Sequence, residues 1–143
     1  DPYFIVADYP KESQIIGKAR EINNYKSFWY AEKVKTAKLE FEIINGRKPN
    51  IALMGLAFKP NIDDLRESPA KYIAQEVLQN ANNEEYYIVE PNIVSHKVFK
   101  LTHYDEAIQK ADIIVFLVAH KEFKNLNIEK HKIVLDFCNA SPK

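Results

Sequence analysis

Glycine is scarce in this chain, which has only Gly17, Gly46 and Gly55 among its 143 residues. The glycine-rich loops that hold phosphate groups, Gly-x-Gly-x-x-Gly and the Walker loop, need closely spaced glycines. These three lie too far apart in the sequence to form either loop. The sequence therefore lacks the usual dinucleotide fingerprint, and we do not expect the chain to hold a whole dinucleotide by itself.

Cysteine occurs once, as Cys138, which excludes a disulfide within the chain and favours a reducing compartment such as the cytoplasm. No apolar run approaches the roughly 20 residues that a membrane-spanning helix needs. The 20 basic residues balance the 20 acidic ones, so composition indicates neither nucleic acid nor a membrane as a partner. Because the chain begins at Asp1 rather than at methionine, we expect its natural N-terminus to lie upstream.

The first third of the chain predicts a helical arm. Residues 1–10 are aromatic and bounded by proline, and we expect them to form an extended lead-in. From Lys11 to Asn45 apolar residues recur at helical spacing, in one helix or in two with a break near Asn23. Gly46 is the expected stop. This arm is too long for one small domain to bury.

One apolar stripe on the arm is expected to be exposed and to pack against a second, symmetric copy of the chain. The stripe consists of Tyr30, Val34, Phe41 and Ile44.

The remainder of the chain alternates between short apolar strands and helices. The predicted strands are 51–54, 86–89, 112–118 and 132–136, with a further short one at 98–101. The predicted helices are 69–80 and 105–111, the first with Ser68 as its N-cap and Pro69 at its first position. This alternation predicts an α/β fold with a Rossmann-like, doubly wound parallel sheet. A boundary near Gly46 divides the arm, residues 1–47, from an α/β domain, residues 48–143.

The most informative segment is residues 55–70, which follow a predicted strand and run into a predicted helix. Parallel α/β sheets bind their ligands at this place, at the carboxyl ends of the strands. The segment offers an aromatic ring, Phe58, and two cations, Lys59 and Arg66. Such groups can hold an anionic nucleotide.

Within this segment, Phe-Lys-Pro-Asn-x-Asp-Asp-x-Arg-Glu-Ser-Pro resembles the signature of the C-terminal domain of UDP-sugar 6-dehydrogenases. The opening Asp-Pro-Tyr-Phe and the Ala-Arg-Glu-Ile-Asn of residues 19–23 are also similar to family segments, so the likeness covers nearly the whole chain. The spelling of residues 60–65 is most similar to members that act on UDP-N-acetyl-D-mannosamine.

The resemblance implies a C-terminal fragment of an NAD-dependent enzyme that oxidises the sugar C6 alcohol to a carboxylate through cysteine-bound intermediates. Phe58 and Lys59 would contact the UDP-sugar, and Arg66 would reach the pyrophosphate of an NAD held mainly by a domain outside this chain. Asp1 aligns with an aspartate that positions the hydrolytic water. The arm would form a homodimer. Without the nucleophilic cysteine and the NAD fingerprint, the chain alone is predicted to be inactive.

Other polar residues have plainer interpretations. Asp63 and Asp64 indicate a shaped loop more than a metal site, and either of them, or Glu67, can pair with Arg66. Glu90, before Pro91 and Asn92, follows a predicted strand and favours a turn over a ligand contact.

The four histidines lack the spacing of metal ligands. They are His96, His103, His120 and His131. His120 is expected to be a loop residue, with a place in the interdomain cleft as the alternative that the resemblance offers. Cys138 has no activating partner in the sequence, and it stands where many family members carry a basic residue for substrate contact, which leaves part of the substrate site open.

Two other functions stay open at this point. One is a family member that uses UDP-glucose, UDP-N-acetylglucosamine or a GDP sugar. The other is a non-catalytic nucleotide-binding or dimerisation module.

Overall fold

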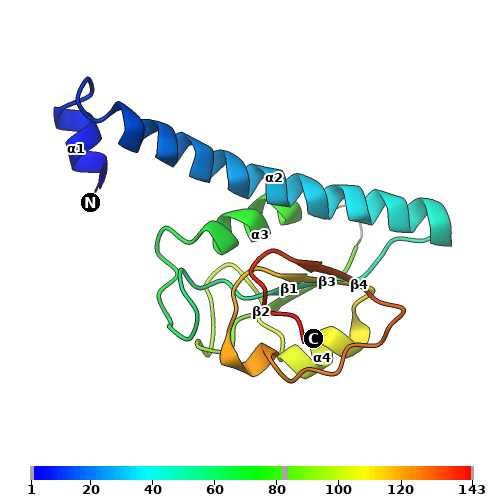
Figure 1. Ribbon diagram of the computed structural model, residues 1–143. Coiled ribbons are helices and arrows are strands. Elements are labelled where there is room, and N and C mark those ends of the chain that lie inside the picture. The colour runs from blue at the N-terminus through cyan, green and yellow to red at the C-terminus, as the bar shows by residue number, and fades with distance from the viewer. Residues whose placement is uncertain (1, 82–83, 143) are drawn as a thin grey trace.

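The computed structural model describes residues 2–81 and 84–142, and it contains a four-stranded parallel sheet (Figure 1). The strands are β1 (Ile51–Met54), β2 (Tyr86–Val89), β3 (Ile113–Phe116) and β4 (Ile133–Asp136). Their spatial order is β2-β1-β3-β4. The chain therefore leaves β1 toward one edge and returns to its other side at β3, which confirms the predicted doubly wound sheet.

Helices cover both faces of this sheet (Figure 1). On one face lie α2 (Gln14–Asn45) and α3 (Pro69–Gln79), and on the other lie α4 (Tyr104–Lys110) and the short 3-10 helix η1 (Lys121–Phe123). Helix α1 (Pro2–Asp8) lies away from the sheet, beside the N-terminal end of α2 (Figure 1). In β1, Ile51 and Leu53 belong to the core cluster shared with α2 and α3, whereas Ala52 and Met54 belong to the cluster shared with α4 and η1. Because alternate residues of a strand face opposite sides, a strand covered on both faces must be apolar throughout.

The main part of the arm is one uninterrupted helix, α2, which lies across α3 and extends past the sheet domain toward α1 (Figure 1). No break occurs at Asn23. The helix ends where predicted, at Gly46, whose φ of 65° suits a left-handed cap and whose N–H donates to the Glu42 carbonyl.

The predicted exposed stripe on α2 is wrong. Val34 is 0% exposed and Phe41 is 8% exposed, because both pack into the core beneath the arm. Tyr30 stacks on Phe137, with ring centroids 4.3 Å apart. Only Ile44 is exposed. The same apolar spacing predicts a helix face that packs either on a partner chain or on the chain's own sheet. In this structure the face packs on the sheet.

The opposite face of α2 carries large apolar side chains that the rest of the described chain leaves uncovered. They are Ile15, Ile22, Tyr25, Trp29, Leu39 and Ile43. The helix is thus apolar on two sides, one of which is unpartnered in a single copy of the chain.

A buried ion pair also attaches the arm to the sheet domain. The Lys38 ammonium lies 2.9 Å from Glu84, and the two side chains are 12% and 1% exposed. Lys38 donates in addition to the Asn80 carbonyl at the end of α3. Because a buried carboxylate needs a partner, this contact fixes the position of α2 over α3.

Two local predictions are corrected by the structure. The expected extended lead-in is instead largely helical, because it contains α1. Proline is compatible with the first position of a helix, where its missing N–H would have no helical partner. The expected strand at 98–101 is reduced to one bridge between Leu101 and Ile88. The His96 ring accepts the N–H groups of Val98 and Phe99 and so removes them from strand pairing.

Among the described helices, none combines the length and apolar character needed to cross a membrane.

Candidate functional site

The candidate site lies at the carboxyl edge of the sheet, where the chain leaves β1 and β3 in different directions. Residues 55–68 follow β1, Glu90 follows β2, and His120 lies four residues after β3. Neighbouring strands that are connected in opposite directions leave a crevice at this edge, which is where open α/β sheets bind ligands.

The loop leaves β1 through Gly55, which has a φ of 97°. A Cβ atom at this position would lie 2.7 Å from the Cβ of Val118. Both the backbone conformation and the close approach of the two loops therefore require glycine. The next two residues, Leu56 and Ala57, are buried, and the loop reaches solvent at Phe58.

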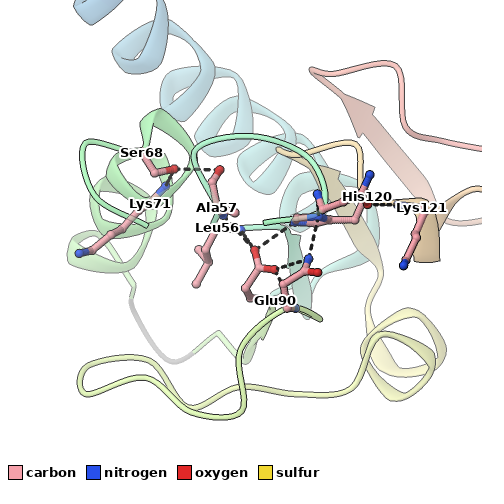
Figure 2. A network of polar contacts seen from close by, with 9 residues as sticks. Leu56, Ala57, Ser68, Lys71, Glu90, His120 and Lys121 are labelled. Carbon is pink, nitrogen blue, oxygen red and sulfur yellow. Dashed lines mark hydrogen bonds and ion pairs between the residues drawn. The ribbon is translucent and has the colours of Figure 1, made fainter. Parts of the chain in front are cut away.

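A buried carboxylate, that of Glu90, organises the inner part of the loop (Figure 2). Its Oε2 accepts the N–H groups of Leu56 at 2.7 Å and Ala57 at 2.9 Å. The same oxygen lies 3.1 Å from Nε2 of His120. Its Oε1 accepts the backbone and side-chain N–H groups of Asn92, both at 3.1 Å. Both oxygens are thus used by the protein itself.

The His120 ring is completely buried beside this carboxylate. Its Nδ1 lies 3.0 Å from the Asn61 backbone nitrogen, and a backbone N–H can only donate, so Nδ1 accepts. The neutral tautomer with the proton on Nε2 satisfies both sides, because Nε2–H then donates to Glu90. The side-chain amide of Asn92, 3.0 Å from Nδ1, fits the same assignment as a second donor.

These contacts explain the ionisation of Glu90. Burial raises the pKa of its carboxyl group, but hydrogen bonds from His120 and from the backbone of Leu56 and Asn92 outweigh burial and lower the pKa from 4.5 to about 2. Glu90 is therefore a buried anion at neutral pH, stabilised by donors from three strand ends.

Asn61 connects the outer part of the loop to the same network. Its backbone has a φ of 61°, a left-handed conformation that asparagine tolerates better than most residues. Its N–H donates to His120, and its side-chain Oδ1 accepts the N–H of Lys121 at 2.8 Å. The loop following β1 is thereby attached to the segment following β3.

Phe58 and Lys59 lie on the exposed stretch between these attachments. The Phe58 side chain is 48% exposed, and the Lys59 ammonium lies 5.8 Å from the centre of its ring. The Phe58 N–H donates to the Asp64 carbonyl at 2.8 Å, which closes the loop behind them. The two residues predicted to bind substrate therefore stand together at the carboxyl edge of the sheet, and their role stays a prediction.

Arg66 forms an ion pair within the loop, as one of the sequence-based alternatives expected. Its guanidinium makes two contacts with Asp64, Nε to Oδ1 at 3.0 Å and an NH2 nitrogen to Oδ2 at 2.8 Å. Hydrogen bonds from this side chain and from the Arg66 N–H lower the pKa of Asp64 to about 2. The Arg66 side chain is 88% exposed, so its outer N–H groups still face solvent.

The helix that follows the loop begins as the sequence predicts. The Ser68 hydroxyl accepts the N–H of Lys71 at 3.3 Å and donates to the carbonyl of Ala57 at 3.2 Å (Figure 2). Ser68 therefore caps α3 and also attaches its N-terminus to the start of the loop.

Cys138 has no features of a nucleophile. Burial and the neighbouring Asp136 carboxylate raise the pKa of its thiol to about 12. Asp136 itself accepts the N–H groups of Cys138, Ala140 and Ser141 and so shapes the turn after β4.

The other polar candidates lie apart from the network. His103 caps α4, and His131 is an exposed partner of Glu129. Asp63 and Glu67 are exposed on the loop, Glu67 with a φ of 54°. Asp1 lies outside the described residues. Within residues 2–81 and 84–142, no cluster of three His, Cys, Asp or Glu side chains has the arrangement of a metal site.

Sequence reasoning missed the Glu90–His120 contact. Both residues were noted after strand ends, but they are 30 positions apart in the sequence. The available signal was the predicted parallel sheet, because the residues that follow parallel strands lie at the same end of the sheet. Here β2 and β3 flank β1 in parallel, which brings Glu90 and His120 together.

Residues 52–142 match the model of the UDP-glucose/GDP-mannose dehydrogenase family, UDP binding domain. The chain is 44% identical over 137 residues to the UDP-N-acetyl-D-mannosamine dehydrogenase of Escherichia coli (strain K12), covering 89% of this chain and 32% of that protein. The enzyme of the same description from Campylobacter jejuni is 41% identical, covering 96% of this chain and 33% of that protein.

A solved structure of the UDP-N-acetyl-mannosamine dehydrogenase from S. aureus matches with a TM-score of 0.73 and 31% identity. The match covers 100% of this chain and 34% of that one. The chain thus spans about a third of the length of the curated relatives it matches.

Replacing Glu90 by glutamine is expected to destabilise the fold in a pH-dependent way. An amide group would turn a donor toward N–H groups that now meet carboxylate oxygens. Because folding lowers the pKa of Glu90 from 4.5 to about 2, its stabilisation is fully present above the unfolded value and is lost as pH falls through the folded value. At neutral pH we expect E90Q to lose roughly 3 kcal/mol of unfolding free energy.

Urea denaturation of both proteins, followed by circular dichroism from neutral pH down to about pH 3, measures this difference. The gap should narrow as pH falls below 4.5. The control is E12Q, which changes an exposed carboxylate on the turn before α2 and should leave stability unchanged. A gap that stays constant over this range would show that the charge of Glu90 does not stabilise the fold.

Proposed function

Because the chain belongs to the UDP-glucose/GDP-mannose dehydrogenase family, we propose that it is the UDP-sugar-binding part of an NAD-dependent UDP-N-acetyl-D-mannosamine 6-dehydrogenase. The enzyme would oxidise the sugar C6 alcohol to a carboxylate and give UDP-N-acetylmannosaminuronate, a precursor for polysaccharide synthesis. Within it, residues 48–143 would bind the UDP-sugar and residues 1–47 would serve dimerisation. The single cysteine fits a cytoplasmic enzyme.

The observation that carries this proposal is the placing of Phe58 and Lys59. Both are exposed on a loop whose flanking residues are fixed by hydrogen bonds, at the carboxyl edge of the sheet, where parallel sheets bind ligands. Lys59 supplies a positive charge for a phosphate or a sugar hydroxyl, and Phe58 supplies a flat apolar surface.

NAD would act as the hydride acceptor. This chain offers groups that could contact only a small part of such a cofactor. In a dinucleotide-binding domain, the turn after the first strand presents its N–H groups to the pyrophosphate. Here the N–H groups of Leu56 and Ala57 are bound to Glu90. Arg66 remains, with its exposed guanidinium, as the residue that can reach the pyrophosphate of an NAD held by another domain.

The outer face of α2 supports a homodimer. It presents Ile22, Trp29 and Ile43 to solvent, on a helix whose other face already packs on the sheet. A second copy of the chain, placed by a two-fold axis across this face, would bury the same side chains twice.

The first prediction concerns nucleotide affinity. The 143-residue chain should bind UDP, and Lys59→Met should weaken binding by roughly tenfold or more, since a hydrogen bond to a charged group is lost. Isothermal titration with UDP and GDP measures this. Lys124→Met changes another exposed lysine and should have no effect. Tighter binding of GDP than of UDP would favour the GDP-sugar alternative, and no binding of either would exclude a nucleotide-binding role.

The second prediction concerns catalysis by a longer protein that carries this chain behind its NAD-binding domain. It should form two NADH per UDP-N-acetyl-D-mannosamine, because oxidation of an alcohol to a carboxylate removes four electrons. UDP-glucose and UDP-N-acetylglucosamine should give little. Turnover of one of these instead would keep the reaction and change the substrate. UDP binding without any turnover would support the non-catalytic module.

The third prediction concerns assembly. Sedimentation equilibrium should give twice the chain mass of 16.6 kDa for the wild type. Ile22→Asp should give the monomer, because it places a charge within the proposed dimer face. Val94→Asp, on a fully exposed loop residue away from the arm, should stay dimeric. A monomeric wild type at micromolar concentration would contradict the dimer.

A further inference from the structure

Hydrogen bonds fix the loop on both sides of residues 58–60, which are exposed. On one side, the N–H groups of Leu56 and Ala57 donate to the Glu90 carboxylate. On the other side, the N–H of Asn61 donates to the His120 ring. The residues that would meet the ligand therefore have few free dihedral angles between two fixed points.

The two fixed points belong to one buried unit. Glu90 and His120 are joined by a 3.1 Å contact, and both side chains are 0% exposed. With its proton on Nε2, the His120 ring has each nitrogen engaged, one toward Glu90 and one toward Asn61. A shift of the His120 ring would therefore move the Asn61 end of the segment relative to the Ala57 end.

The conformation of Asn61 makes the second attachment necessary. A φ of 61° costs free energy for any residue except glycine, and a free loop would relax away from it. Bonds to His120 and to the Lys121 N–H compensate for this cost.

We propose that Glu90 and His120 are positioning residues for nucleotide-sugar binding. They fix the two ends of the segment 58–60, so that the Phe58 ring and the Lys59 ammonium are in place before the ligand arrives. Neither Glu90 nor His120 touches the ligand. Ordering a loop upon binding would reduce affinity, and a loop that is already ordered avoids this cost. The proposal rests on the proposed function, because it requires Phe58 and Lys59 to contact the nucleotide sugar.

Two amide replacements of His120 separate the two ring contacts. In His120→Asn, the side-chain oxygen takes the place of Nδ1 and can accept the Asn61 N–H, while the contact with Glu90 is lost. In His120→Gln, the side-chain nitrogen takes the place of Nε2 and can donate to Glu90, while Asn61 loses its acceptor. Each variant buries one neutral amide, so each serves as the control for the other.

Three measurements on the 143-residue chain test the positioning role. They are UDP affinity by calorimetry, the exchange rate of the Asn61 amide proton by NMR, and the free energy of unfolding. We expect H120Q to bind UDP about tenfold more weakly than the wild type, and its Asn61 amide proton to exchange about tenfold faster. H120N should stay within about threefold of the wild type in both. Across the wild type and the two variants, UDP affinity should therefore correlate with the protection of the Asn61 amide proton from exchange, and not with the free energy of unfolding.

The possible failures are distinct. If the wild type binds UDP and H120Q binds it equally well despite faster Asn61 exchange, the positioning role is overturned and the proposed function stands. The same holds if H120N and H120Q lose affinity only in proportion to their loss of stability, since His120 is then merely structural. If the wild type does not bind UDP, the proposed function itself fails and the positioning role fails with it.

Discussion

A carboxylate buried where parallel strands end must have its lone pairs satisfied by neighbouring donors, and Glu90 meets this requirement with donors from three separate segments. The start of the loop after β1, the turn after β2 and the ring after β3 all converge on it. Because all three segments donate to this one buried group, the shape of this edge of the sheet depends on its charge. The charge lies below the surface and leaves the loop's outer side chains free for a ligand.

This arrangement differs from the usual way in which the fold binds nucleotides. A glycine-rich turn uses its own N–H groups as the binding surface. In this chain the corresponding N–H groups face inward to Glu90, so side chains such as Lys59 must supply the contacts with an anion. This arrangement agrees with the proposed function, in which another domain would hold the dinucleotide.

Much of the fold could be predicted from the sequence, because its signals are local. The apolar run of β1, the Ser68 cap and the Gly46 stop each depend on a few neighbouring residues. The segment 55–70 is likewise predicted as the candidate site from its composition and its place after a strand, and its role stays a prediction. What could not be predicted depends on tertiary packing. The spacing of Val34 and Phe41 does not say which surface covers them, and nothing local marks His120 as buried.

Helix α2 projects well beyond the part of it that is packed on the sheet domain. Its buried side chains lie between Ser27 and Phe41, so the thirteen residues from Gln14 to Lys26 extend about 20 Å beyond this fixed portion. A tilt of about 5° at the fixed portion would displace the far end by about 2 Å, given the length of the projecting part. Small changes in packing under Val34 and Ala31 are thereby enlarged at the N-terminal end of α2, where helix α1 lies (Figure 1).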